Sequence, residues 1–161
     1  MKDRIVFITG ASSGIGLGCA RKFASQGASL ILNARNVTVL EDIKKELETK
    51  YATRVLLLPF DVRNRDEVAK ALTSLSQEWQ AVDVLINNAG LVIGLDKEHQ
   101  GNLDEWDVVI DTNIKGLLTV TRLLVPGMVE RGRGHIINIG SIAGDGAYPG
   151  GSVYCATKAA V

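Results

Sequence analysis

The sequence predicts an α/β protein in which a doubly wound parallel sheet lies between two layers of helices. Short apolar runs recur along the chain, each bounded by glycine or polar residues. Between them, apolar residues are spaced three or four positions apart, as in helices that pack one face against a sheet. Strand and helix alternate about five times, which is typical of parallel strands joined by helical crossovers.

The expected strands are rich in Val, Ile and Leu and are apolar on both faces, as in parallel strands covered by helices on either side. They cover residues 5–8, 29–32, 55–58, 84–86 and 135–139.

The helices are expected at 16–26, 37–50, 65–78 and 104–130. In the third, Asp66 and Glu67 suit the first turn, where carboxylates interact favourably with the helix dipole. The fourth is long, and Pro126 predicts either a kink or its last turns. Trp79 and Trp106 are expected to pack in the interior.

The sequence ends at Val161, a few residues into what should be another helix. Doubly wound dinucleotide-binding folds usually have six or more strands, and about five are recognisable here. We therefore expect a three-layer αβα fold that is incomplete at the C-terminus. Residues 1–161 would form the N-terminal portion of a single nucleotide-binding domain of the Rossmann type.

Composition argues against several classes of function. Eighteen basic and eighteen acidic residues give a formal net charge of zero, so no nucleic-acid or membrane-surface partner is expected. Cys19, Cys155, His99 and His135 do not have metal-ligand spacing, and no metal site is expected. The apolar run at residues 5–8 is too short for a signal peptide or a membrane span, which predicts a cytoplasmic protein.

A glycine-rich turn follows the first strand and opens a helix, in the sequence TGASSGIG at residues 9–16. Glycines there permit a tight turn and close approach to a phosphate, and the helix amides would point at a pyrophosphate. The alternative is a glycine-rich helix entry without a ligand. The candidate cofactor-binding residues in this turn are Gly10, Ser12, Ser13, Gly14, Ile15 and Gly16.

The residues after the second strand indicate which nicotinamide cofactor binds. An acidic residue there would bind a ribose 2′-hydroxyl and repel a 2′-phosphate. This chain has Ala34 at that position, followed by Arg35, whose guanidinium suits a phosphate dianion. The prediction is NADP(H), and the alternative is that Arg35 is a solvated residue at a helix entry.

Two further loops supply candidate cofactor contacts, at Asp61-Val62 and Asn87-Asn88-Ala89-Gly90. The Asp61 carboxylate could accept a hydrogen bond from the adenine amino group, or it could cap the next helix, where Asn64 competes for that role. In the second loop, Asn88, Ala89 and Gly90 suit a segment that braces the sheet and touches the cofactor ribose. Taken alone, this second loop could also be a simple turn.

Tyr154 and Lys158 carry the expected chemistry. On a helix they are four residues apart and share one face. An ammonium near a phenol favours the phenolate, which makes the phenol a usable general acid and base. Such a pair is common on protein surfaces. This one, however, follows the strand at 135–139 and a loop that begins Gly140-Ser141.

Together these motifs resemble those of the short-chain dehydrogenase/reductase family. TGASSGIG, NNAG, DTNIKG with Asn113, NIGSIAG with Ser141, and YCATK occur in the family order, with Ser141 thirteen residues before Tyr154. The resemblance implies that Tyr154 is the catalytic acid and base and that Lys158 tunes it and anchors the ribose. It also implies that Ser141 orients the substrate oxygen and that Asn113 holds a water linking Lys158 to solvent.

Several stretches are similar to the NADP-dependent 3-hydroxy acid dehydrogenases of this family, namely residues 61–64, 88–91, 126–131, 134–141 and 148–151. That similarity implies oxidation of small 3-hydroxy acids such as serine, reduction of small semialdehydes, and a homotetramer or homodimer when complete. A 3-oxoacyl reductase or other carbonyl reductase is the nearest alternative. A non-catalytic nucleotide-binding fragment, inactive because truncated, is the alternative of another class.

Overall fold

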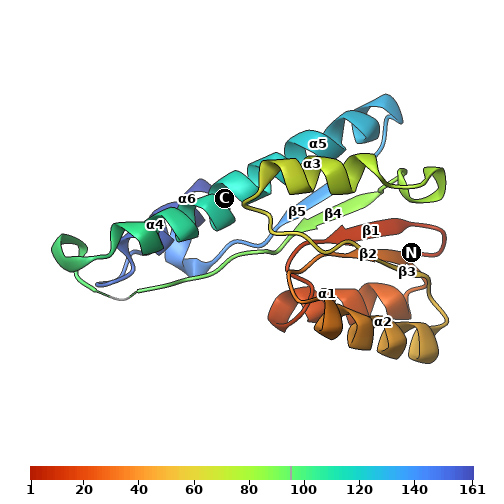
Figure 1. Ribbon diagram of the computed structural model, residues 1–161, viewed down its shortest axis with the longest axis horizontal. Coiled ribbons are helices and arrows are strands. Elements are labelled where there is room, and N and C mark those ends of the chain that lie inside the picture. Colours follow the sequence, from red (N-terminus) through yellow and green to blue (C-terminus); the bar gives the residue numbers. More distant parts are fainter. Residues whose placement is uncertain (95) are drawn as a thin grey trace.

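A computed structural model of the chain describes residues 1–94 and 96–161. Within these residues, parallel strands form one five-stranded sheet in the order β3-β2-β1-β4-β5 (Figure 1). The strands are β1 (Ile5–Ile8), β2 (Ser29–Leu32), β3 (Val55–Leu57), β4 (Val84–Asn87) and β5 (His135–Asn138). The chain winds outward from β1 in both directions, which confirms the predicted doubly wound sheet.

Helices cover both faces of this sheet, as the three-layer prediction requires. Figure 1 shows α1 and α2 on one face and α3 and α5 on the other. The helices are α1 (Gly14–Ser25), α2 (Val37–Tyr51), α3 (Arg65–Thr73), α4 (Leu103–Ile110), α5 (Leu117–Glu130) and α6 (Ser152–Ala160).

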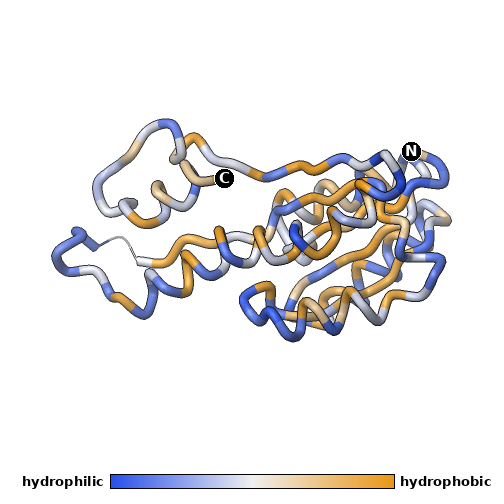
Figure 2. Tube along the Cα trace, turned by 90° about the horizontal axis from the view of Figure 1, so that it is seen from above, coloured by the Kyte–Doolittle hydropathy of each residue, from blue (hydrophilic) through white to orange (hydrophobic). Residues whose placement is uncertain are grey.

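The two layers have separate apolar cores, because successive strand residues point to opposite faces. In β1, Val6 and Ile8 pack in the core under α1 and α2, whereas Ile5 and Phe7 pack in the core under α3 and α5. The Phe7 ring meets Phe60 edge to face, with centroids 6.5 Å apart. In Figure 2 the hydrophobic stretches run along the strands, and the outer turns are hydrophilic.

Strand β5 differs from the other four. It was predicted to be covered on both sides, but His135, Ile136 and Asn138 are exposed and Ile137 is half-buried. Its apolar residues pair with β4 along the backbone, but burial of their side chains depends on what packs over the sheet, which the strand's own sequence does not specify.

The first two predicted helices shift by at most two residues at either end, whereas the third and fourth differ more from the structure. The third was expected to reach residue 78 but ends at Thr73, where the Thr73 and Ser74 hydroxyls donate to carbonyls of the last turn. Such bonds compete with helix continuation, and a separate 3₁₀ turn then carries the buried Trp79. The fourth, expected at 104–130, is interrupted by a π turn, η3 (Asp111–Gly116). Pro126 lies in the last turns of α5, which is one of the two outcomes expected for it.

Asp83 ties the amino-terminal ends of the central strands together. Its buried carboxylate accepts hydrogen bonds from the Ile5 amide at 3.0 Å and from Arg4 at 2.8 Å, and lies 3.3 Å from Arg133. We expect Asp83→Ala to lower the free energy of unfolding by about 1–3 kcal/mol, because a buried amide loses its acceptor. Urea denaturation measures this loss.

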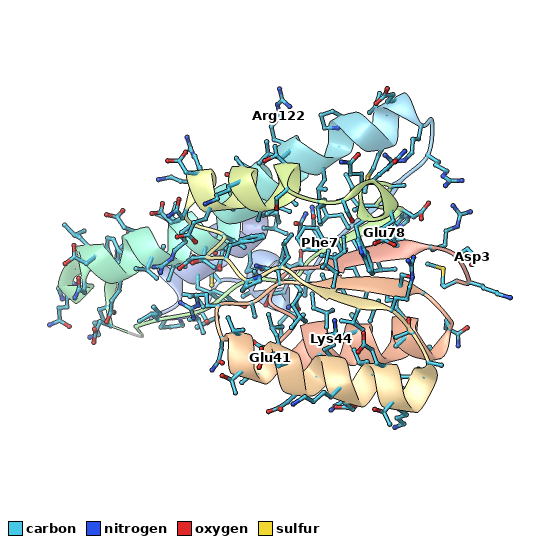
Figure 3. The ribbon with its side chains drawn as sticks, turned by 45° about the vertical axis from the view of Figure 1, so that its right-hand side comes forward. Asp3, Phe7, Glu41, Lys44, Glu78 and Arg122 are labelled. Carbon is cyan, nitrogen blue, oxygen red and sulfur yellow. The ribbon has the colours of Figure 1, made fainter. Side chains whose placement is uncertain are left out.

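The matched control is Glu78→Ala, at a residue labelled in Figure 3. This variant removes a carboxylate from the exposed ion pair with Arg54. Exposed pairs contribute less than about 1 kcal/mol. Equal losses for the two variants would contradict the role given to Asp83.

Candidate active site

A cavity of about 480 Å³ opens at the carboxyl ends of the strands. The chain runs outward from β1 toward β3 on one side and toward β5 on the other, and parallel sheets bind ligands at the point where this direction changes. The cavity lies at that point. It is lined by Gly10, Ser12, Ser13, Gly14, Ile15, Asn33, Ala34, Arg35, Phe60, Asp61, Val62, Asn88, Ala89, Gly90, Leu91, Val92, Thr112, Ile139, Gly140, Tyr154 and Lys158. The structure therefore brings together every predicted cofactor residue except Gly16, which lies inside α1 and does not line the cavity.

The glycine-rich turn packs tightly against the helix that it opens and against the loop after β4. Gly10 has a φ of +63° and lies where a side chain would approach the backbone of Ala89 to 2.9 Å. At Gly16, inside α1, a side chain would collide with the Gly10 carbonyl and the Asn88 amide. Glycine at these two positions therefore lets the turn, the start of α1 and the loop after β4 pack closely together.

The loop after β4 braces this turn through hydrogen bonds. The Asn88 side-chain amide donates to the carbonyls of Thr9 and Gly10, at 3.0 and 2.9 Å. In return, the Thr9 hydroxyl accepts from the backbone amides of Asn88 and Ala89. The structure thus shows the brace expected of this loop, and the contact with a ribose stays a prediction.

Arg35 lies at the rim of the cavity, after β2. The buried side chain of Asn33 fixes this end of β2 by donating to the carbonyls of Leu58 and Phe60, both at 3.0 Å. The next helix is capped by Asn36, which accepts from the Val39 amide. Arg35 is exposed and forms no ion pair with any described residue, so its guanidinium is available to an anion in the cavity.

Asp61 also lines the cavity, in the segment after β3, and is paired with Arg63. The guanidinium donates to the carboxylate at 2.6 and 3.0 Å, and this hydrogen bonding holds the pKa of Asp61 below its ordinary value. The helix cap is Asn64, which accepts from the amides of Asp66 and Glu67. The alternative interpretation of Asp61 as the cap is therefore wrong, and Asp61 remains an anionic acceptor facing the cavity.

Tyr154 and Lys158 reach the same cavity from α6, one helical turn apart. The Lys158 ammonium donates to the Ile139 carbonyl at 2.8 Å, just past the end of β5. Partial burial lowers the pKa of Lys158 from its ordinary value. The side chain is thereby held near Tyr154 at a fixed point on the sheet edge.

Asn113 and Ser141 do not line the cavity. The Asn113 amide, buried in η3, donates to the Leu91 carbonyl and the Thr157 hydroxyl and accepts from the Leu91 backbone amide. A side chain on Gly90 would meet Asn113 Oδ1 at 3.3 Å and Lys158 Nζ at 3.5 Å, so these two groups approach one another there.

The Ser141 hydroxyl accepts from the Ala143 amide at 3.2 Å and caps the short turn Ile142–Gly144. Contact between this hydroxyl and a substrate therefore stays a prediction.

Some lining residues have no sequence signal and were missed. Phe60, Leu91, Val92, Thr112, Ile139 and Gly140 contribute backbone atoms or ordinary side chains to the wall of the cavity. Thr157, inside the YCATK motif, was also missed; it does not line the cavity but accepts a hydrogen bond from the Asn113 side chain.

Two structural findings bear on other kinds of site. Among residues 1–94 and 96–161, no group of three or more His, Cys, Asp and Glu side chains is placed to hold a metal ion. In the same ranges, no helix has both the length and the apolar character needed to cross a membrane.

Residues 4–161 match the family described as short chain dehydrogenase. The NADP-dependent 3-hydroxy acid dehydrogenase YdfG of Salmonella typhi is 48% identical over 157 residues, which are 98% of this chain and 62% of that protein. The NADP-dependent 3-hydroxy acid dehydrogenase of Schizosaccharomyces pombe is 45% identical, over 100% of this chain and 62% of that protein. The chain thus spans about 62% of the length of these relatives.

Solved structures agree with this similarity. Serine dehydrogenase from Escherichia coli superimposes with a TM-score of 0.91 at 46% identity, covering 96% of this chain and 70% of that one. The closed form of serine dehydrogenase complexed with NADP⁺ gives 0.89 at 45% identity, covering 96% and 61%. These findings confirm the resemblance, including the subgroup, that the motifs predicted.

Proposed function

Because the chain belongs to the short-chain dehydrogenase family, we propose that residues 1–161 are the NADP(H)-binding portion of a single-domain oxidoreductase. In the natural protein, meaning the whole oxidoreductase of which residues 1–161 would be a portion, a hydride would pass between the nicotinamide and a small 3-hydroxy acid or its carbonyl counterpart. The observation that carries this proposal is that Tyr154 and Lys158 share one cavity with the glycine-rich turn. Similarity to 3-hydroxy acid dehydrogenases supports the substrate class.

The lining of the cavity fits the parts of NADP(H). The turn at residues 10–16 would hold the pyrophosphate, since Gly10, Ser12, Ser13, Gly14 and Ile15 line the cavity where α1 begins. Arg35 would bind the 2′-phosphate, and Asp61 and Val62 would contact the adenine. Residues 88–90 and Lys158 would contact the nicotinamide ribose. When bound, the nicotinamide supplies the hydride acceptor or donor.

Tyr154 is the proposed proton carrier. During oxidation it takes the substrate hydroxyl proton as the hydride leaves the carbon, and during reduction it returns that proton to the carbonyl oxygen. The Lys158 ammonium, held at the Ile139 carbonyl, would place a positive charge one helical turn from Tyr154. Ser141 would orient the substrate oxygen, and Asn113 would hold a water next to Lys158.

Arg35→Ala tests the choice of cofactor. We expect NADPH affinity to fall about tenfold while NADH affinity stays nearly unchanged, because only the 2′-phosphate loses a charge-assisted hydrogen bond. Fluorescence titration of both cofactors measures the difference.

The matched control for Arg35→Ala is Arg122→Ala, which removes an exposed positive charge on α5, away from the cavity (Figure 3). That variant should leave both affinities unchanged. Similar losses for NADPH and NADH in Arg35→Ala would overturn the assignment.

Turnover of NADP⁺ with L-serine by the natural protein tests the reaction itself. NADPH formation supports a 3-hydroxy acid dehydrogenase, whereas reduction of a 3-oxoacyl thioester alone would favour the carbonyl reductase alternative. NADPH binding without turnover on either substrate would leave a non-catalytic nucleotide-binding protein. Size-exclusion chromatography of the natural protein tests the proposed homodimer or homotetramer.

A further inference from the structure

Thr157 joins the helix that carries Tyr154 and Lys158 to the π turn that carries Asn113. It lies inside α6 and only 1% of its surface is exposed. Its hydroxyl donates to the Tyr154 carbonyl at 2.8 Å and accepts from the Asn113 side-chain amide at 3.0 Å. One buried hydroxyl group thus donates a hydrogen bond within α6 and accepts another from the π turn.

Asn113 extends this link to the loop after β4. Its side chain donates to the Leu91 carbonyl and accepts from the Leu91 amide, both at 2.9 Å. Both N–H groups of the side chain are therefore used, one by Leu91 and one by Thr157. Loss of the Thr157 hydroxyl would leave one of them buried without an acceptor, which is unfavourable.

The link acts on the placement of the proton carrier. Lys158 follows Thr157 directly and has its own anchor at the Ile139 carbonyl. Tyr154 precedes Thr157 by one turn, and its carbonyl is the group that Thr157 holds. A shift of α6 relative to the π turn would change the positions of both side chains in the cavity.

From these contacts we infer that Thr157 is a positioning residue: through Asn113 its hydroxyl holds α6 where Tyr154 and Lys158 meet the substrate oxygen and the cofactor. Thr157 does not line the cavity, so it acts on the reaction only through the residues that it holds. The inference rests on the proposed oxidoreductase function.

The test is Thr157→Val in the natural protein, since valine keeps the shape and removes the hydroxyl. We expect kcat per folded site to fall about tenfold or more, because small displacements of reacting groups are costly. NADPH affinity should fall less than kcat does, because the turn at residues 10–16 and Arg35 are untouched, and the pH dependence of kcat should shift. Thr157→Ser, which keeps the hydroxyl, should restore both kcat and the pH profile.

Thr73→Val is the control variant. Thr73 also donates from a helix to carbonyls of its own turn, but it is exposed and lies at the end of α3. Its replacement should alter neither kcat nor the pH profile.

Hydrogen exchange gives a second readout that does not depend on activity. The Leu91 amide donates to Asn113, so its exchange should become faster in Thr157→Val than in the wild type. If valine prevents folding, Thr157→Ala replaces it in both measurements.

Unchanged kcat and pH profile in Thr157→Val, in a protein that Tyr154→Phe inactivates, would overturn the inference and leave the proposed function standing. A loss of thermal stability alone, with normal kcat per folded site, would overturn it too. If the wild type shows no turnover, the proposed function fails, and unaltered Leu91 exchange would then also refute the link.

Discussion

Tyr154→Phe in the natural protein is expected to lower kcat by about 10²–10⁴-fold, the usual contribution of a positioned general acid and base. Phenylalanine keeps the ring that lines the cavity and removes only the hydroxyl that would carry the proton. Because the turn at residues 10–16 and Arg35 are untouched, NADPH should bind with nearly unchanged affinity. Steady-state turnover with L-serine and a separate NADPH titration measure the two effects.

Tyr51→Phe is the matched control. Tyr51 ends α2, away from the cavity, and its ring packs near the Lys50 ammonium at 5.3 Å. That variant should retain full turnover. Turnover retained in Tyr154→Phe would remove Tyr154 from the acid and base role, and a comparable loss of NADPH binding would show that its hydroxyl serves the cofactor instead.

The fold was largely predictable because buried parallel strands are continuous apolar runs that end at glycine or polar residues. The exposure of β5 was not predictable from its own residues, since it depends on neighbouring elements. The π turn at Asp111–Gly116 was also missed. One turn with a wider hydrogen-bond spacing barely disturbs the apolar pattern of a long helix.

The residues of the candidate site likewise fall into some that the sequence indicates and others that only the structure reveals. Turn glycines, Arg35, Tyr154 and Lys158 are visible in the sequence because their chemistry needs particular residue types at fixed spacing. The Ile139 carbonyl that holds Lys158 has no such signal, since any residue supplies a carbonyl. The contact between Thr157 and Asn113 joins residues 44 positions apart, and only the tertiary structure brings them together.

Gly16→Ala is expected to weaken NADPH binding about ten- to a hundredfold and to lower the free energy of unfolding by about 1–3 kcal/mol, as overpacking does. The new methyl group would collide with the Gly10 carbonyl and the Asn88 side-chain amide. Those two groups are hydrogen-bonded to each other at 2.9 Å, so relief of the collision must either break the brace or move the turn. Either movement displaces the amides proposed to bind the pyrophosphate.

Gly18→Ala separates this steric effect from helix propensity. Gly18 lies in the same helix, two residues further on, and a methyl group there meets nothing within 4 Å. Alanine favours a helix over glycine by about 1 kcal/mol, so Gly18→Ala should be slightly stabilising and leave NADPH affinity unchanged. Urea denaturation and NADPH titration of both variants provide the comparison. If Gly16→Ala behaved like Gly18→Ala in both, close packing of α1 against the turn would not be what requires glycine at residue 16.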